Sequence, residues 1–420
     1  MASLCPIAKL TNQIFHGQPG DVQTAAHASS YHMEIYDSIA DAGKDWCSVV
    51  PQNDPYWKID FLRSLEIRPP GNFQFRYIVF YHDKEPVGVA YAQITKFSAW
   101  QSIRGDIQAG GSRKTLFTKF RQWLAKQLNL NTLILGNTLV SGQYAYYFKP
   151  GCELSPKEIQ EATEVLADSL QENGLPIHFI AIKDLDTKAV KSWNGKNPSW
   201  SKVCFQPRMV VKIDDRWNSS EDYLSDMQSK YRVRYRRARK KLVPVTDRRL
   251  SLDDIRLFQD EMYTLYLSVA EQSGFNLVEL DKAYWWRLKD MFGRDFSVRG
   301  YFLDGKLVGF YSLLRGDHAI WHANYLGYDQ QVNSDHQLYL NMLYDMVESA
   351  IEGKASELDF SRTALEIKSS VGAKPEELFC YFKHTHLFVN PLVPWLTGVI
   401  APEEDWQPRH PFKEMGTEKV

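Results

Sequence analysis

One supersecondary unit occurs twice along this chain of 420 residues, and this repeat constrains the fold more than any other feature. Two short hairpin sequences end at Gly88 and Gly309, which lie 221 positions apart. Two further landmarks repeat in the same order at nearly the same offset: the aromatic pairs Tyr56-Trp57 and Tyr284-Trp285 upstream, and the strand endings 135–138 and 360–363 downstream. Because three ordered landmarks share one offset, we expect tandem domains of one fold.

Composition narrows the class of protein. Hydrophobic residues make up 44% of the chain, enough for buried cores in two or three domains. The net charge of -1 gives no overall attraction to nucleic acid, so no DNA partner is expected. Five cysteines without C-x-x-C spacing predict neither a disulfide framework nor a zinc site. No secretory leader or spanning helix is recognised, so we expect a cytoplasmic protein, with the inner face of the membrane as an alternative location.

The first half carries clear helix signals between Ser155 and Gly174. Ser155 is followed by Pro156 and then Glu158, which predicts a capping box, and Gly174 predicts the C-terminal end. Hydrophobic periodicity predicts these further elements: a helix at 54–66, strands at 73–81 and 87–94, a helix at about 114–128, and strands at 133–135 and 177–182. A polar segment at 186–202 follows, and we place a domain boundary near residue 206.

The second half opens with a helix capped by Ser219 and Asp222, whose apolar positions recur every three or four residues as far as Leu242. The pattern then predicts helices near 251–272 and 281–292, a meander of strands at 297–303, 307–315 and 318–325, a helix at 336–352, and strands at 358–360 and 379–386. The strand at 358–360 is expected to pair in parallel with the last strand of the meander.

The predicted fold class is therefore α+β. We expect two tandem domains, residues 1–206 and 207–390, each with a mixed, mostly antiparallel sheet flanked by helices, and then a proline-rich tail at 391–420. The segment from Leu387 to Pro402 is uncharged and interrupted by prolines. We interpret it as a buried tail; the alternative is a surface that touches lipid or an acyl chain.

The order of elements resembles the GNAT acyltransferase fold, and its tandem form resembles the Fem-type enzymes that add amino acids to peptidoglycan precursors, together with related bacterial GNAT-like proteins. Two stretches carry the resemblance. Residues 231–241 (YRVRYRRARKK) are similar to the arginine-rich helix that opens the second repeat of these proteins, and residues 360–373 resemble their stretch after the fifth strand. The resemblance implies two GNAT-like domains that transfer an acyl or aminoacyl group to an amine.

The resemblance also bears on the donor. GNAT enzymes that use acyl-CoA usually carry R/Q-x-x-G-x-G/A, whose backbone amides hold a pyrophosphate at a helix N-terminus. The second repeat has neither glycine nor arginine at 329–335, and residues 110–114 (GGSRK) of the first repeat match in part. We expect acyl-CoA as the donor substrate and no tightly bound cofactor; the alternative is a donor carried on a carrier protein or on tRNA.

Eight of the twelve residues from Lys230 to Lys241 are basic. A charge run is usually a solvated helix face. The alternative is a phosphate clamp, because an arginine fork matches two phosphate oxygens. The candidate phosphate-binding residues are Arg232, Arg236 and Arg239, and their targets would be CoA, a tRNA backbone or a lipid headgroup.

A second polar set, Arg362, Glu366 and Lys368, follows the strand at 358–360. These residues could form local salt bridges of little energetic value. We favour a functional interpretation, in part through the resemblance. Glu366 would orient or deprotonate the amine, and Arg362 and Lys368 would donate to a phosphate or to a developing oxyanion.

The last strand of the meander supplies further catalytic candidates. His322 would deprotonate the incoming amine, since its usual pKa lies near neutrality, although a strand histidine is more often structural. Tyr325 or Tyr339 would protonate the leaving group. His384 and His386 share a strand face without an accompanying carboxylate cluster, so no metal site is predicted.

These observations favour an N-acyltransferase that acts on a small-molecule or lipid-linked amine in a cleft of the C-terminal repeat. One alternative is a non-catalytic protein that binds nucleic acid or anionic lipid through the basic helix 230–241. Another is a peripheral membrane protein that uses residues 387–402. No G-x-S-x-G, H-E-x-x-H or complete P-loop motif occurs, which removes most support for hydrolase, zinc-protease and NTPase functions.

Overall fold

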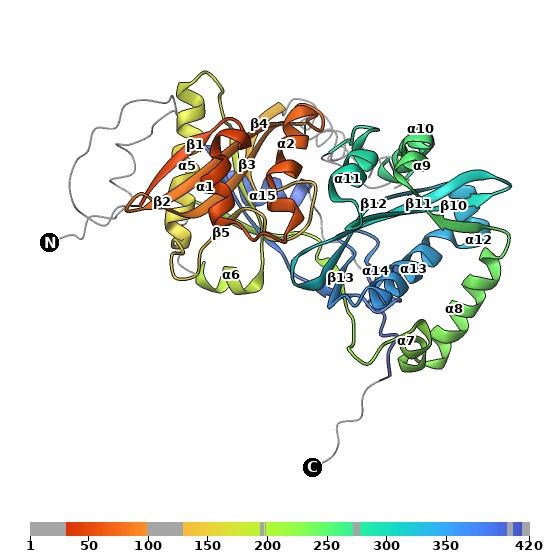
Figure 1. Ribbon diagram of the computed structural model, residues 1–420. Helices are drawn as coiled ribbons and strands as arrows, with labels where there is room; N and C mark the ends of the chain where they lie inside the picture. Colours follow the sequence, from red (N-terminus) through yellow and green to blue (C-terminus); the bar gives the residue numbers. More distant parts are fainter. Residues whose placement is uncertain are drawn as a thin grey trace, which may run out of the picture. The chain divides into compact units, whose positions relative to one another are not determined.

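The computed structural model describes residues 31–98, 129–193, 197, 199–271, 278–400 and 406–413. The chain forms two compact units (Figure 1), and each is described by itself. The first unit comprises Met1–Phe205, Leu277–Glu279 and Glu377–Glu403; the second comprises Gln206–Asn276, Leu280–Glu376 and Glu404–Val420. Within the described part of the chain, no helix is both long and apolar enough to cross a bilayer.

The first unit is built on a sheet of eight strands in the order β1-β2-β3-β4-β6-β15-β7, with β5 paired to β3. The β4–β6 pair is parallel and the other pairs are antiparallel. The strands are β1 (Tyr31–Tyr36), β2 (Gln74–His82), β3 (Glu85–Ser98), β4 (Asn129–Leu135), β5 (Tyr146–Phe148), β6 (Phe179–Leu185), β7 (Ser201–Cys204) and β15 (Phe379–His384). The helices are α1 (Ile39–Val49), η2 (Pro55–Trp57), α2 (Ile59–Ile67), α5 (Pro156–Glu172), α6 (Thr187–Ser192), η4 (Asn390–Leu392) and α15 (Val393–Ile400).

The second unit is built on a sheet of seven strands in the order β14-β8-β13-β12-β11-β10-β9. The β12–β13 pair is parallel, as predicted, and the other pairs are antiparallel. The strands are β8 (Arg208–Lys212), β9 (Thr246–Arg249), β10 (Phe296–Leu303), β11 (Lys306–Arg315), β12 (Ile320–Tyr328), β13 (Glu357–Asp359) and β14 (Lys374–Glu376). The helices are α7 (Ser220–Asp226), α8 (Ser229–Leu242), α9 (Leu252–Leu257), α10 (Gln259–Ala270), α11 (Tyr284–Phe292), η3 (Asp317–Ala319), α12 (Gln330–His336), α13 (Leu338–Glu352) and α14 (Leu365–Ser369). Each unit thus has the predicted α+β class, a mixed, mostly antiparallel sheet with helices.

Helices cover both faces of the second sheet. Helix α13 packs on the face that carries Tyr311 and Leu313, where its apolar side chains complete a continuous buried core. The opposite face carries Phe310, whose ring meets Trp285 of α11 edge-on at 5.1 Å, and Trp285 in turn meets Tyr266 of α10. Neighbouring residues of β11 therefore serve two separate helical layers, because successive strand side chains point to opposite faces.

The repeated hairpins are equivalent in the two units. The β2–β3 and β10–β11 hairpins carry register shifts at Phe80/Tyr81 and Tyr301/Phe302, which lie the same 221 positions apart as the two glycines. Both glycines are sites of close packing: a Cβ at Gly88 would lie 2.0 Å from the Phe148 ring, and one at Gly309 would lie 2.6 Å from Met342 Cε. The hairpin landmark thus corresponds to one structural feature used twice.

The third landmark of the repeat was matched wrongly. The ending 135–138 follows β4, which pairs antiparallel with the hairpin strand β3, whereas the ending 360–363 follows β13, which pairs in parallel with β12. By pairing, β4 corresponds to β12, and β6 corresponds to β13. The two segments have similar sequences because a buried strand followed by a polar turn is a common local pattern. The helix expected at about 114–128 lies outside the described residues.

Three further expectations require correction. The helix predicted from Ser219 to Leu242 is two helices, because Met227 is extended (ψ 150°) and Gln228 N donates to the carbonyl of Pro411. The predicted strand 379–386 is β15, but it pairs with β6 and β7 of the first unit, not with the second domain to which residues 207–390 were assigned. The tail is not fully buried: Leu387 and Phe388 are 80% and 87% exposed. Pairing between distant segments decides the second of these points, and local patterns do not encode it.

Candidate active site at the β12–β13 fork

The two parallel strands of the second unit form a fork. Pairing joins Ile320–His322 of β12 to Glu357–Asp359 of β13, and β13 then ends while β12 continues to Tyr328. His322 and Asp359 are the last pair before the strands separate. Because partners in one register lie on the same face of a sheet, the imidazole and the carboxylate share one face at the fork.

A β-bulge follows directly on β12. The register between β11 and β12 shifts between Tyr311 and Leu313, so that Asn324 and Tyr325 together stand opposite Ser312. The Ser312 hydroxyl donates to the Tyr325 carbonyl at 2.7 Å, and this hydrogen bond stabilises the bulge. Bulges re-aim side chains and are enriched next to active sites.

The bulge brings polar groups onto the face that carries His322. Asn324 Nδ2 donates to the hydroxyl of Tyr284 at 3.2 Å, and the Tyr325 ring meets Tyr284 edge-on at 5.6 Å. Asn324 Oδ1 and Trp285 Nε1 are buried and have no hydrogen-bond partner among the described residues. Buried polar atoms without partners are costly, so their presence beside a bulge marks this position as a candidate for substrate contact.

Charged groups surround the end of β13. Asp359 Oδ2 lies 3.9 Å from His322 Nδ1 and 3.3 Å from Arg208 Nη1, and Arg208 Nη2 also binds Glu376 at 2.7 Å. His322 is 7% exposed. Burial lowers the pKa of His322, and the carboxylate of Asp359 opposes this shift. A neutral imidazole is able to accept a proton at neutral pH.

The loop after β13 has a strained backbone held by Lys368. Ser361, Thr363 and Ala364 have φ values of 59°, 66° and 48°, a region that side-chain-bearing residues seldom adopt. Lys368 Nζ donates to the carbonyl of Phe360 at 2.8 Å and also to that of Arg362. Burial lowers the pKa of Lys368 to about 7. Strain of this kind persists where surrounding contacts over-determine it, and it clusters at functional sites.

The remaining residues of the predicted polar set lie in different surroundings. Glu366 is exposed, and its carboxylate binds Arg409, with Nε–Oε1 at 3.0 Å. Arg362 is half-buried in the strained loop. Tyr339 lies in the first turn of α13, where its ring stacks on Tyr328 at 5.5 Å and burial raises its pKa. The structure therefore brings Lys368 close to Asp359 and places Arg362 in the strained loop, Glu366 at the exposed surface and Tyr339 on another element.

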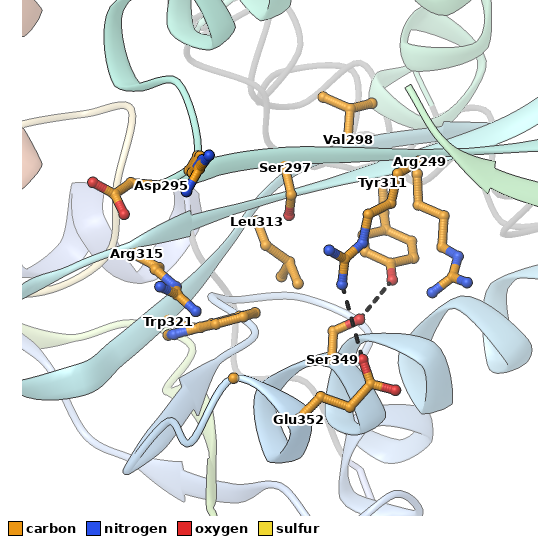
Figure 2. Close-up of a pocket in the computed structure, with 13 residues that line it drawn as sticks. Arg249, Asp295, Ser297, Val298, Tyr311, Leu313, Arg315, Trp321, Ser349 and Glu352 are labelled. Atoms are coloured by element: carbon orange, nitrogen blue, oxygen red, sulfur yellow. Dashed lines mark hydrogen bonds and ion pairs between the residues drawn. The ribbon is translucent and has the colours of Figure 1, made fainter. Parts of the chain in front are cut away.

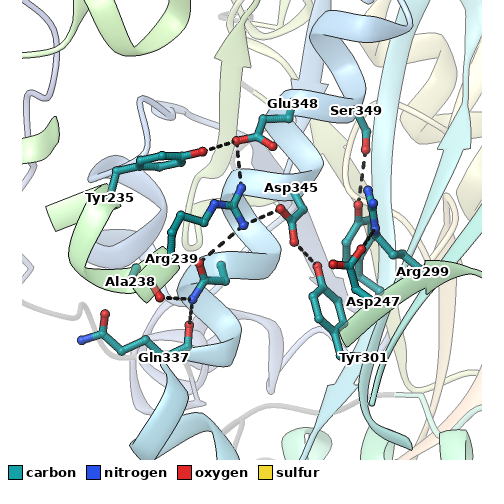
Figure 3. A network of polar contacts seen from close by, with 12 residues as sticks. Tyr235, Ala238, Arg239, Asp247, Arg299, Tyr301, Gln337, Asp345, Glu348 and Ser349 are labelled. Atoms are coloured by element: carbon teal, nitrogen blue, oxygen red, sulfur yellow. Dashed lines mark hydrogen bonds and ion pairs between the residues drawn. The ribbon is translucent and has the colours of Figure 1, made fainter. Parts of the chain in front are cut away.

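The arginines of α8 divide into two kinds (Figure 3). Arg239 pairs with Asp345 at 2.6 Å and with Glu348 at 2.8 Å, and Asp345 also accepts from the Tyr301 hydroxyl. Arg232 donates to the carbonyl of Met227, and Arg236 is exposed. Arg239 thus joins α8 to α13 and the sheet as a structural residue, and Arg236 is the candidate that remains exposed to a ligand.

Two further sequence expectations concern a phosphate motif and a metal site. The partial phosphate motif at 110–114 lies outside the described residues. Among the residues that are described, no group of three or more histidine, cysteine, aspartate or glutamate side chains is arranged to hold a metal ion.

Sequence reasoning missed three residues of the fork: Arg208, Asn324 and Asp359. Asp359 directly follows the buried residue Leu358 in a strand that was predicted, and a buried carboxylate at a strand end was the available signal. Arg208 and Asn324 gave no signal, because their roles depend on antiparallel pairing with β13 and on a bulge.

No known protein-family profile matches the sequence, and no curated protein sequence matches it. Among solved structures, the chain is similar to FemX, with 14% identity and a TM-score of 0.48 over 86% of this chain and 98% of that one. It is also similar to a tandem GNAT protein from the clavulanic acid biosynthesis pathway, with 12% identity and a TM-score of 0.46 over 84% of this chain and 99% of that one. A third similar structure is L-PGS from Bacillus licheniformis, with 10% identity and a TM-score of 0.43 over 83% of this chain and 97% of that one. These values describe a distant likeness in the arrangement of helices and strands, and they say nothing about individual residues or activity.

Proposed function

We propose that the chain is an N-acyltransferase, which moves an acyl or aminoacyl group from an activated donor to an amine at the β12–β13 fork of the second unit. The observation that carries the proposal is the pairing of His322 with Asp359 at the point where the parallel strands separate. Acyl-CoA is the proposed donor, and the acceptor is a small-molecule or lipid-linked amine.

The chemistry of amide formation matches the groups at the fork. The amine nitrogen attacks the acyl carbonyl, the new C–N bond forms, and the C–S bond of the thioester breaks. His322, held neutral by burial, takes the proton from the amine, and Asp359 stabilises the imidazolium that results. The Tyr325 hydroxyl supplies a proton to the departing thiolate.

The remaining requirement is stabilisation of charge on the carbonyl oxygen, and we assign it to Trp285 of α11. The indole N–H of Trp285 is a buried donor without a partner among the described residues. A fixed donor in a water-poor site is the arrangement that lowers the barrier of acyl transfer most. Glu366 keeps its predicted role as a second candidate for orienting the amine.

The test is release of CoA thiol from acetyl-, hexanoyl- and palmitoyl-CoA in the presence of a panel of amino acids, amino sugars and phosphatidyl-linked amines. We expect release with at least one pair of donor and acceptor, and loss of at least a hundredfold in His322→Asn, in keeping with removal of a general base. Glu366→Gln is the companion variant that separates the two candidate bases. Full activity of a folded His322→Asn protein would remove His322 from the mechanism, and an absence of release with every pair would contradict acyl-CoA as the donor.

A second proposal concerns membrane contact by the first unit. Leu387 and Phe388 are 80% and 87% exposed, and Leu392 and Trp395 are about half exposed, at 53% and 49%. Exposed apolar and aromatic side chains on adjacent turns are typical of surfaces that enter the lipid headgroup region. Flotation with anionic liposomes tests this. We expect the wild-type chain to float and Leu387→Ser/Phe388→Ser to remain at the bottom; equal flotation of both proteins would contradict the proposal.

A further inference from the structure

A cavity of about 280 Å³ lies between the sheet of the second unit and the C-terminal end of α13 (Figure 2). Four strands (β9 to β12), the turn before β10 and the helix end contribute its walls. The lining residues are Arg249, Arg294, Asp295, Ser297, Val298, Arg299, Tyr311, Leu313, Arg315, Trp321, Ser349, Glu352 and Gly353. Four arginines against two carboxylates give the lining an excess of positive charge.

The cavity is on the other face of the sheet from the fork. Trp321 lines the cavity, and His322, the next residue of β12, pairs in register with Asp359. Because successive strand side chains point to opposite faces, the cavity and the candidate active site are separated by the sheet. The inference below therefore goes beyond the proposed function.

The arginines differ in how far their charge is already neutralised. Arg299 Nε binds Asp247 at 2.6 Å, and Arg249 approaches Glu352 at 3.9 Å with both side chains 70% exposed, an interaction of little energetic value. Arg294 and Arg315 are exposed and form no ion pair with any described residue. Two guanidinium groups at one cavity are thus available to an anion.

Neighbouring contacts position these donors. The Arg315 guanidinium lies 4.7 Å from the centre of the Trp321 ring, and Trp321 packs so closely on Gly353 that a Cβ there would lie 2.2 Å from the ring. Ser297 and Ser349 add hydroxyl groups to the same wall, and the hydroxyls of Ser349 and Tyr311 lie 3.3 Å apart. Guanidinium forks together with hydroxyl donors are the set that recognises phosphoryl oxygens.

The helix end accounts for only part of this arrangement. The C-terminus of α13 carries a partial negative charge that favours nearby cations. One or two arginines would satisfy that charge, and Arg249 already lies near this helix end, 3.9 Å from Glu352. Arg294 and Arg315 line the same cavity without a carboxylate partner among the described residues, so an anion bound there would offset their charge. We infer that this cavity binds a small phosphate-bearing ligand, separately from the acyl-transfer site.

The test is isothermal titration of the full chain with inorganic pyrophosphate at constant ionic strength, with a thermal melt in parallel. We expect saturable binding of one equivalent and a rise in melting temperature by mass action. Arg294→Gln/Arg315→Gln should weaken binding by about ten- to a hundredfold, the usual effect of losing hydrogen bonds between charged groups. Arg63→Gln, an exposed arginine of the first unit, is the matched control and should leave binding unchanged.

Further ligands identify the source of the phosphate. Tighter binding of glycerol 3-phosphate than of inorganic phosphate would indicate an organic phosphate monoester, and the reverse order would indicate the free ion; both outcomes support the site. Absence of saturable pyrophosphate binding, equal affinity for citrate, or unchanged affinity in the double variant with wild-type circular dichroism would overturn the inference. None of these readouts depends on acyl transfer, so failure here leaves the proposed function intact.

Discussion

Replacing Lys368 by methionine should change how the stability of the protein depends on pH. The ammonium group of Lys368 is buried beneath the strained loop, and burial lowers its pKa to about 7 from the usual 10.5. Between these two values, the unfolded chain carries a proton on this lysine that the folded chain has lost. Protons therefore favour the unfolded state, and the free energy of unfolding rises with pH in this window.

The magnitude follows from the size of the window. Each pH unit between the two pKa values contributes up to about 1.4 kcal/mol, so wild type should gain about 2.5 kcal/mol over Lys368→Met from pH 7.5 to 9.5. Below about pH 6 the lysine is protonated in both states, and the difference between the proteins should no longer change with pH. Other titrating groups are common to both proteins and cancel in the comparison.

Urea unfolding at a series of pH values measures the difference in the free energy of unfolding between wild type and Lys368→Met. The unfolding transition used is the one whose urea midpoint changes in the variant. Lys374→Met, at an exposed lysine of the neighbouring strand β14, is the matched control and should run parallel to wild type. A wild-type minus Lys368→Met difference that stays constant to within about 0.5 kcal/mol from pH 7.5 to 9.5 would refute the reasoning, because it would mean that Lys368 is solvated or remains charged in the folded state.

Three further substitutions test separate parts of the account. Arg239→Ala leaves the buried carboxylate of the Figure 3 network without its cation and should lower the free energy of unfolding by about 3–5 kcal/mol, against less than about 0.5 for the exposed Arg236→Ala. Gly327→Ala places a Cβ 2.4 Å from backbone of α10 and should cost about 3 kcal/mol, and more than Gly309→Ala, whose obstacles are the ends of flexible side chains; urea midpoints decide. In active protein, the rate should decrease at acid pH as His322 becomes protonated. Because burial lowers the pKa of His322, the midpoint of this decrease should lie below the usual histidine value. A midpoint above about pH 6.5 would contradict this assignment.

Local signals in the sequence predicted local structure well. Ser155 and Glu158 form the predicted capping box, and Ser219 and Asp222 form the second. Hydrophobic alternation located the β10–β11–β12 meander, and chain order was enough to predict that β13 would pair in parallel. These features depend on residues close in sequence or on a general rule of topology.

Features set by distant segments escaped prediction. Nothing in residues 379–384 indicates that β15 completes the first sheet, because a half-buried strand pairs with whichever edge the fold presents. The sequence of α8 does not distinguish Arg239 from the exposed arginines of the same helix, because the carboxylates that bind Arg239 come from α13. At the fork, His322 and Tyr325 were predicted candidates, but the carboxylate that faces His322 lies 37 positions away along the chain.

Native mass spectrometry with coenzyme A and acyl-CoAs of increasing chain length tests the central claim most directly. The account predicts a complex with one equivalent of at least one acyl-CoA, retained in His322→Asn because that residue moves a proton and does not hold the donor. Absence of a complex with every thioester would contradict acyl-CoA as the donor and direct the search to aminoacyl-tRNA or carrier-protein donors.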